Sequence, residues 1–229
     1  MRMADILFTQ GFGTRRICAG LIQHGTVTAA GRVVDDPHED VATEDLTFTV
    51  QGQSWPFHAR LLVMLNKPAG YECSRVPKHH PSVLSLLPEP LRNRGAQPVG
   101  RLDEDTTGLL LLTDDGPLIH RLTHPKRHLD KVYEVQTRHA LDDAQVAAML
   151  AGVTLLDDPR PAVARAAAIV CPHHLRLTLT EGRYHQVKRM LAAVGNRVDG
   201  LHRSAFGALA LPADVPPGHW RWLSAETVF

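Results

Sequence analysis

The segment GRLDEDTTGLLLLTDDG, residues 100–116, decides the fold that we expect for this chain. Asp103, Glu104 and Asp105 stand directly before the apolar run GLLLLT, and a DDG turn closes that run. A short apolar run bounded by turn residues is typical of a buried strand. Carboxylates at the mouth of a core strand are costly to bury unless they are paired or functional. Arg101 is a candidate partner for Asp103, and an exposed acidic turn is the alternative interpretation.

Further strands are predicted on both sides of this segment. LLVMLN (61–66), KVYEVQT (131–137) and LRLTLT (175–180) have the apolar runs or alternation of strands. Pro117 is placed to begin a helix after the DDG turn. Strands and helices do not alternate regularly, so we predict an α+β domain over residues 61–229 on a mixed, mainly antiparallel sheet.

The first fifty residues have a different organisation. Two short helical patterns are followed by TVTAAGRVV (26–34), which predicts a hairpin, and Thr14 is placed to cap the second helix. The polar, proline-containing stretch QGQSWPFHAR (51–60) has the character of a linker. We therefore predict a small module over residues 1–50, joined by a linker to the larger domain.

The composition is ordinary for a soluble globular protein, with 44% hydrophobic and 21% charged residues. Apolar runs such as LLLL (109–112) are far shorter than the roughly 20 residues that span a bilayer, so no membrane span is expected. The N-terminal segment lacks an apolar signal core. Cys18, Cys73 and Cys171 form no CxxC pair, which favours a reduced, cytoplasmic protein without disulfides or a zinc ribbon.

Neither a metal nor a cofactor is expected. His120, His124 and His128 have helical spacing, but Pro125 would break a helix joining all three. The sequence contains no P-loop, no dinucleotide glycine fingerprint and no HExxH motif.

Basic residues are concentrated in three stretches, although the net charge is only +1. Such concentrations can bind phosphates even in a nearly neutral protein, and solvated surface charge is the alternative for any one of them. The stretches contain Arg2, Arg15, Arg16 and Arg32, then Arg121, Lys126, Arg127 and Lys131, then Arg183, Lys188, Arg189, Arg197 and Arg203.

A second decisive segment is EGRYHQVKRMLAAVGNRV (181–198), which predicts an amphipathic helix. At about 100° per residue, Lys188 falls on the border of the apolar stripe and Arg189 roughly opposite it. Lys188 can therefore reach a cleft beside the core, while Arg189 is expected to point at solvent or RNA. Tyr133 in KVYEV is either a core aromatic or a ring that stacks on an unstacked base.

These segments together resemble the motif series of the RsuA-type ribosomal RNA pseudouridine synthases. The motifs are LNKPAGYECS, GRLDEDTTGLLLLTDDG, KVYEV and EGRYHQVKRM, in that order. Residues 1–50 are similar to the S4-like, or alpha-L, RNA-binding module of this family. Ala4 and Asp5 depart from the acidic-then-basic pair that is common at the start of that module.

The resemblance implies the isomerisation of a single uridine to pseudouridine without a cofactor. His185 and Gln186 resemble the small-subunit branch, which implies 16S ribosomal RNA, at uridine 516, as the substrate of a monomeric enzyme. The implied catalytic residues are Asp103, Tyr133 and Lys188. The implied supporting residues are Arg101, Leu102, Thr107, Gly108, Tyr184, His185 and Gln186. The expected RNA-binding residues are Arg2, Arg15, Arg16, Arg32, Lys67, Arg127, Arg183, Arg189 and Arg203.

Several alternatives remain open from the sequence. The first is a pseudouridine synthase that acts on 23S ribosomal RNA. A second interprets DEDTT as a DxDxT metal-dependent phosphotransferase site, although that motif normally follows a hydrophobic strand and here it follows PVGRL. A third is a non-catalytic RNA-binding assembly factor on the same fold. Under the synthase interpretation, Glu104 and Asp105 are expected to be structural.

Overall fold

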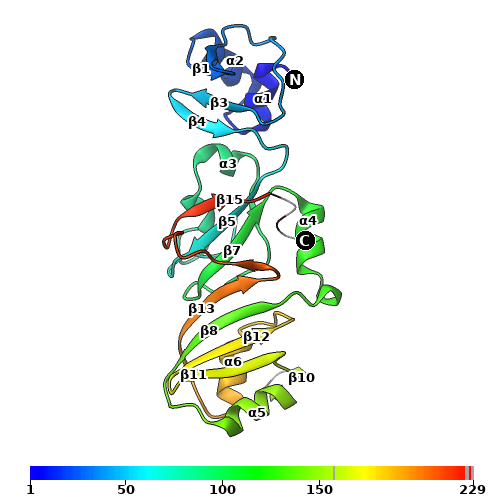
Figure 1. Cartoon of the computed structure of the whole chain (residues 1–229), viewed down its shortest axis with the longest axis vertical. Coiled ribbons are helices and arrows are strands. Elements are labelled where there is room, and N and C mark those ends of the chain that lie inside the picture. The colour runs from blue at the N-terminus through cyan, green and yellow to red at the C-terminus, as the bar shows by residue number, and fades with distance from the viewer. Residues whose placement is uncertain (157, 225–226, 228–229) are drawn as a thin grey trace. The chain divides into compact units, whose positions relative to one another are not determined.

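The computed structural model describes residues 1–156, 158–224 and 227, which form two compact units (Figure 1). Unit 1 comprises Met1–Leu61, Leu87–Gln97 and Thr113–Asp115. Unit 2 comprises Leu62–Leu86, Pro98–Leu112 and Gly116–Phe229. Each unit is built from segments that are distant in sequence, so a single cut in the chain does not separate them.

Unit 1 contains two helices and a small antiparallel sheet near the N-terminus. Thr14 caps the second helix as predicted, because its hydroxyl accepts the N–H of Ile17 at 3.3 Å. Phe48, Ile6 and Ile22 are buried in the core. The elements are α1 (Met3–Thr9), α2 (Arg15–Gln23), β1 (Val27–Ala29), β2 (Arg32–Val33), β3 (Thr47–Val50) and β4 (Gln53–Pro56), with strand order β2-β1-β3-β4.

Part of the range 51–60, for which we predicted a linker, is the strand β4. This strand pairs with β3, and its Trp55 lies opposite Phe48. Trp55 is buried and meets the ring of Phe12 edge to face, with centroids 5.4 Å apart. Gln53 and Ser54, which precede it in β4, are polar and exposed, and Pro56 is partly exposed. Because β4 buries only one large side chain, its composition resembles that of a linker.

Unit 1 also includes α3 (Glu89–Asn93) and the first aspartate of the DDG turn. The guanidinium of Arg94, only 2% exposed, pairs with Asp114 at 2.9 Å. The Asp114 carboxylate also accepts the N–H of Leu61 at 2.9 Å. Asp114 is therefore fully engaged in structural contacts.

Unit 2 is built on a nine-stranded sheet of order β11-β12-β8-β13-β7-β5-β15, in which β14 pairs with β13 and β6 with β7. β13 runs parallel to β7 and antiparallel to β8, so the predicted mixed, mainly antiparallel sheet is confirmed. Its strands are β5 (Leu62–Lys67), β6 (Gln97–Pro98), β7 (Thr107–Thr113), β8 (Lys131–Thr137), β11 (Ala166–Cys171), β12 (His174–Leu179), β13 (Val198–Phe206), β14 (Leu209–Ala210) and β15 (Trp220–Trp222).

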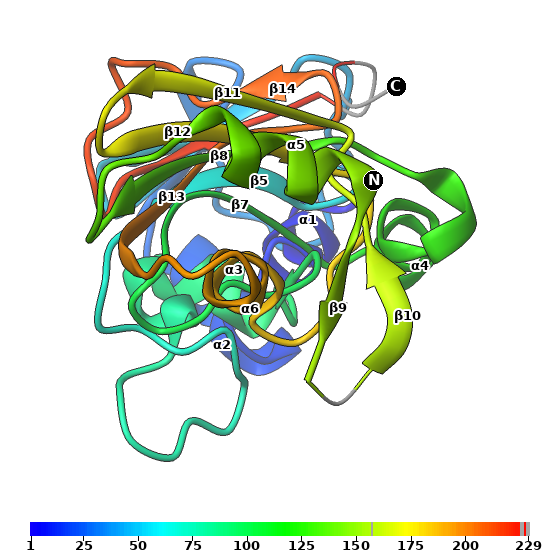
Figure 2. The ribbon, with the colours of Figure 1, turned by 90° about the horizontal axis from the view of Figure 1, so that it is seen from below.

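Helices and a separate hairpin flank this sheet. α6 contacts β13 and β9, and Figure 2 shows it below the sheet strands. The helices are η1 (Val83–Leu86), α4 (Gly116–Thr123), η2 (Pro125–Arg127), α5 (Asp143–Ala151) and α6 (Gln186–Ala193), and the hairpin strands are β9 (Val153–Leu155) and β10 (Asp158–Ala162).

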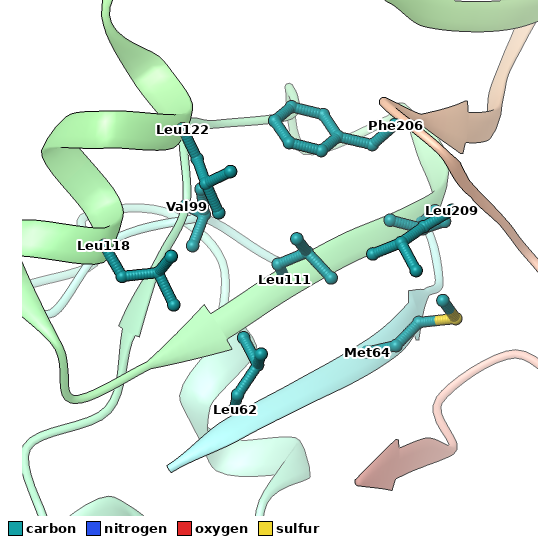
Figure 3. Packing of buried hydrophobic residues seen from close by; sticks show 9 residues of the cluster. Leu62, Met64, Val99, Leu111, Leu118, Leu122, Phe206 and Leu209 are labelled. Atoms are coloured by element: carbon teal, nitrogen blue, oxygen red, sulfur yellow. The ribbon is translucent and has the colours of Figure 1, made fainter. Parts of the chain in front are cut away.

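The main core of unit 2 lies between α4 and the sheet (Figure 3). Leu118 and Leu122 of α4 pack with Leu62 and Met64 of β5 and Leu111 of β7. Side chains on both faces of these two strands are buried. Each strand is therefore a continuous apolar run in the sequence, and from that run it was predicted. This packing holds β5 and β7 against α4.

Gly108 allows β13 to approach the start of β7. Its φ is +100°, and a Cβ atom at this position would lie 2.3 Å from the carbonyl oxygen of Arg203. Only glycine fits both the backbone angle and the contact. Gly108, implied as a supporting residue, thus has a clear structural function in joining two strands of the sheet.

Candidate active site

The acidic turn that precedes β7 is held from inside the protein by Lys67, the last residue of β5. The Lys67 side chain is fully buried, and its ammonium donates to the carbonyl oxygens of Glu104 at 3.0 Å, Thr106 at 2.8 Å and Pro68 at 3.1 Å. Burial lowers the pKa of Lys67, and nearby negative groups oppose that shift. The prediction that Lys67 binds RNA is wrong, because its ammonium is enclosed within the protein.

Local hydrogen bonds complete the turn around Asp103. The N–H of Thr106 donates to the carbonyl oxygen of Asp103 at 3.1 Å. The N–H of Leu102 donates to Sγ of Cys73 at 3.4 Å. The side chain of Asp103 is 28% exposed, so its carboxylate projects from a fixed turn toward an accessible space.

Residues around the start of α6 bring two basic side chains to Asp103. His185 precedes the helix with φ 46°, in the left-handed region that costs a non-glycine residue about 1–3 kcal/mol. Its Nε2 lies 3.4 Å from Oδ1 of Asp103. Nζ of Lys188 lies 3.6 Å from Oδ2 of the same carboxylate. The two side chains thus flank Asp103.

Lys188 makes its hydrogen bonds to Asp105. Its Nζ donates to the two carboxylate oxygens of Asp105 at 2.7 and 2.8 Å. Partial burial acts to lower the pKa of Lys188, but the hydrogen bond and charge of Asp105, with the charge of Asp103, raise it above its usual value. Lys188 therefore points toward the acidic turn, the side on which the helical spacing predicts it. Sequence reasoning missed Asp105 as its hydrogen-bond partner.

Tyr133 forms part of the same site from β8. Its side chain is buried, 8% exposed, and it lies opposite Leu177 and Arg203 on the neighbouring strands. A cavity of about 90 Å³ is lined by Tyr133, Asp103 and Lys188. We refer to this space as the aspartate pocket. The structure thus brings together the three residues for which the sequence implied a catalytic role.

A wider cleft of about 700 Å³ lies next to the aspartate pocket, and both include Asp103 and His185 in their walls. Tyr184 lies in this cleft, 71% exposed, and its ring stacks on His185 with centroids 3.8 Å apart. Such an exposed ring can stack on a nucleic-acid base.

Glu72 organises another part of the wall of this cleft. Its carboxylate accepts the backbone N–H groups of Lys78, His79 and His80 at 3.0, 2.8 and 2.9 Å. These three bonds lower the pKa of Glu72 to about 2. The segment 72–80 is thereby closed into a loop with basic side chains, a feature that the sequence did not suggest.

Comparison with known proteins identifies the family of this chain. A family model described as RNA pseudouridylate synthase matches residues 61–193. The chain belongs to this family. The synthase is therefore an isomerase, and the family predicted from the motifs is confirmed. Membership excludes the phosphotransferase alternative. Residues 1–46 match a second model, the S4 domain, as predicted for the N-terminal module.

The synthase is similar over its whole length to curated relatives. It is 46% identical to the ribosomal small subunit pseudouridine synthase A of Yersinia pestis, over 100% of this chain and 97% of the relative. It is 39% identical to the protein of that name from Escherichia coli, over 98% and 97%. A solved pseudouridylate synthase matches with a TM-score of 0.70 at 33% identity, covering 100% of this chain and 98% of that one.

Five of the supporting residues implied by the resemblance line the aspartate pocket or the wider cleft of the synthase. Arg101, Leu102, His185 and Gln186 line the aspartate pocket with Asp103. Tyr184 lines the wider cleft. Thr107 lies at the start of β7, where its hydroxyl is 2.9 Å from Nδ1 of His202. In the described part of the chain Arg101 forms no ion pair with Asp103, so its suggested partnership with that residue is wrong.

The expected RNA-binding residues of unit 1 lie on its surface. Arg2 and Arg16 are exposed. Arg15 and Arg32, also exposed, pair with Asp5 and Glu39. Surface ion pairs of this kind are weak, so these arginines can exchange a carboxylate for a phosphate.

The expected RNA-binding residues of unit 2 fit the predicted surface role less well than those of unit 1. Arg127 is exposed on η2. Arg203 is buried, 2% exposed, and its Nε donates to the carbonyl oxygen of Leu109 at 2.8 Å, so a surface role for it is wrong. Arg183 is held by the carbonyl oxygens of Arg160 and Pro161 at 2.6 and 3.0 Å.

Arg189 also makes a contact within the protein. Its guanidinium donates to the carbonyl oxygen of Tyr184 at 3.0 Å, and the residue is partly exposed.

In the described ranges, no three or more His, Cys, Asp or Glu side chains are grouped to hold a metal ion. No helix within those ranges is long and apolar enough to cross a membrane.

Proposed function

We propose that the synthase isomerises one uridine of 16S ribosomal RNA, uridine 516, with Asp103 as its catalytic carboxylate. The observation that carries this proposal is the aspartate pocket, in which Asp103 lies among Tyr133, Lys188 and His185. A carboxylate in this position is accessible, fixed by its turn and balanced by the neighbouring Lys188 ammonium, as a catalytic anion requires.

The choice of ribosomal substrate is supported by the relatives. The Yersinia pestis and Escherichia coli proteins are named for the small ribosomal subunit and match the synthase over nearly their entire lengths. His185 and Gln186, which resemble the small-subunit branch, both line the aspartate pocket. The alternative substrate is 23S ribosomal RNA. Mapping pseudouridine in both RNAs from a strain that lacks this protein distinguishes the two.

The reaction explains why a carboxylate is needed. The bond between N1 of uracil and C1′ of the ribose breaks, and the base turns. C5 then bonds to C1′, and the proton on C5 leaves. Attack of Asp103 on carbon and removal of a ribose proton by Asp103 both require the ionised carboxylate. Lys188 balances its charge within the pocket, and the imidazole of His185 lies beside it. Tyr133 provides a wall on which the uracil ring stacks.

RNA binding supplies the energy that exposes the target. A uridine in folded RNA reaches the pocket only when it is flipped out, at a cost of a few kcal/mol. We assign residues 1–50 to RNA binding as an S4-like module and residues 61–229 to catalysis. The exposed Arg15 and Arg16 of α2 are suited to phosphate contacts that offset the cost of flipping.

The test compares two neighbouring aspartates. Asp103→Asn is expected to abolish tritium release from RNA carrying C5-labelled uridine while RNA binding stays close to that of the unmodified protein. Asp105→Asn is the matched control, because it removes the same charge from the same turn. It is expected to retain measurable tritium release. An active Asp103→Asn protein, or equal loss in both variants, would contradict the assignment of Asp103.

A further inference from the structure

A second cavity, of about 320 Å³, adjoins the site in unit 2, and we call it the cationic cavity. Tyr133 and Arg101 line both this cavity and the aspartate pocket. Two other basic residues line it from the neighbouring strands β8 and β13. These are Lys131, which lies opposite Phe206 in the sheet, and Arg203, which lies opposite Tyr133.

Lys131 and Arg203 are held close to one aromatic ring. The Arg203 guanidinium carbon lies 5.2 Å from the centroid of Phe206, and Nζ of Lys131 lies 5.7 Å from it. Nη2 of Arg203 is buried and has no hydrogen-bond partner within the described residues. Burial, followed by the charge of Arg203, lowers the pKa of Lys131, and the more weakly acting charges of Asp130 and Glu181 oppose that shift. Two like charges are therefore kept together at this position.

The carboxylates near the cavity are committed to other cations. Asp130 pairs with Arg165 at 2.9 Å. Glu181, which lines the cavity, pairs with Arg183 at 3.0 Å and accepts a hydrogen bond from Gln186 at 2.8 Å.

Five Lys and Arg residues line the cavity, and two of them, Arg160 and Arg183, pair with Asp158 and Glu181. Among the residues that the structure describes, the other three, Lys131, Arg203 and Arg101, have no carboxylate within ion-pair distance. Lys131 donates only to the carbonyl oxygens of Leu129 and Thr180, at 3.0 and 3.4 Å. Partly desolvated cations without an ion-pair partner are unfavourable, and an anion bound in the cavity offsets that cost.

We propose that the cationic cavity binds a phosphate group, and that during catalysis this is a phosphodiester of the substrate RNA adjacent to the target uridine. Lys131 and Arg101 are the accessible contacts, while the buried Arg203 supplies charge from the floor. This inference rests on the proposed function. A ribose beside Asp103 carries phosphates on both sides, and the shared walls at Tyr133 and Arg101 let one of them enter the second cavity.

The test is a double-mutant cycle between protein and RNA. Substrate RNAs are made with one phosphate at a time replaced by an uncharged methylphosphonate, and tritium release is measured with the unmodified protein and with Lys131→Gln. One linkage next to the target is expected to raise KM about tenfold in the unmodified protein and less than twofold in Lys131→Gln. Lys131→Arg keeps the charge and is expected to restore the tenfold effect. Lys126→Gln, on the exposed η2, is the control and is expected to match the unmodified protein.

Free phosphate is the other source of the same group. Inorganic phosphate is expected to raise the thermal midpoint of the unmodified protein, with a smaller effect on Lys131→Gln. If phosphate does so but every methylphosphonate effect is independent of Lys131, the RNA assignment is overturned. If neither measurement depends on Lys131, the whole site is overturned. Failure of the proposed function is distinct, because it would appear as tritium release that persists in Asp103→Asn.

Discussion

Lys67→Met is expected to destabilise the synthase and slow catalysis together. The substitution keeps the length of the side chain and removes an ammonium that donates to the carbonyl oxygens of Pro68, Glu104 and Thr106. The Lys67 side chain is fully buried, so water does not replace it as a donor. Glu104 keeps a second donor, the N–H of Gly70 at 2.8 Å, so most of the cost falls on the other two carbonyl groups.

The expected magnitude follows from two opposing contributions. Each hydrogen bond from a charged donor contributes about 1.5–3 kcal/mol, which makes the gross loss for three bonds about 4.5–9 kcal/mol. Removing a buried ammonium recovers several kcal/mol of desolvation cost. The net decrease in the free energy of unfolding is therefore about 2–4 kcal/mol. Because the lost bonds hold the turn that carries Asp103, kcat is expected to fall by at least about tenfold.

Urea unfolding followed by tryptophan fluorescence measures the stability change. Trp220 and Trp222 lie on β15, which pairs with β5, so they report on the strand that ends at Lys67. Lys126→Met, an exposed lysine in the same unit, is the matched control and is expected to change neither stability nor rate. A free energy of unfolding within about 0.5 kcal/mol of the unmodified protein, with unchanged kcat, would refute the anchoring function of Lys67.

Two further predictions concern the cleft wall and the N-terminal module. Because the pKa of Glu72 is about 2 in the folded protein, below its usual value of 4.5, its loop is stabilised above pH 4.5 and loses that stabilisation as the pH falls toward 2. Glu72→Gln is expected to abolish this pH dependence of amide exchange at residues 78–80, and an unchanged profile would count against it. Replacing Arg15 and Arg16 with Gln is expected to weaken the dependence of RNA affinity on salt. The slope of log K against log salt concentration should fall by about one unit per lost phosphate contact, while kcat is unchanged. An unaltered slope would show that neither arginine contacts the RNA.

The parts of the site that sequence could predict are those governed by local periodicity. Helical geometry distinguished Lys188 from Arg189, and Lys188 does face the acidic turn. The apolar runs of β5 and β7 predicted two buried strands, because both faces of these strands are covered. Residues whose positions follow from a single helix or strand were therefore accessible from the sequence.

Contacts that depend on turn conformation were not accessible in the same way. Nothing in the order Asp103, Glu104, Asp105 indicates which carboxylate accepts hydrogen bonds from Lys188. Lys67 and Arg203 were predicted on the surface because cations are seldom fully buried. Their burial depends on carbonyl groups that only the folded backbone brings near, such as those of Thr106 and Leu109.

The division of contacts between the two aspartates bears on the proposed catalytic role. Asp105 accepts two short hydrogen bonds from Lys188, so its oxygens are engaged. Asp103 has Nζ of Lys188 at 3.6 Å and Nε2 of His185 at 3.4 Å, so the lysine balances its charge without a strong hydrogen bond from either side chain. A carboxylate that must attack carbon or accept a proton needs a lone pair that no strong donor occupies. Under the proposed role of Asp103, Asp105 therefore holds Lys188 near enough for electrostatic balance and too far to block the oxygen that reacts.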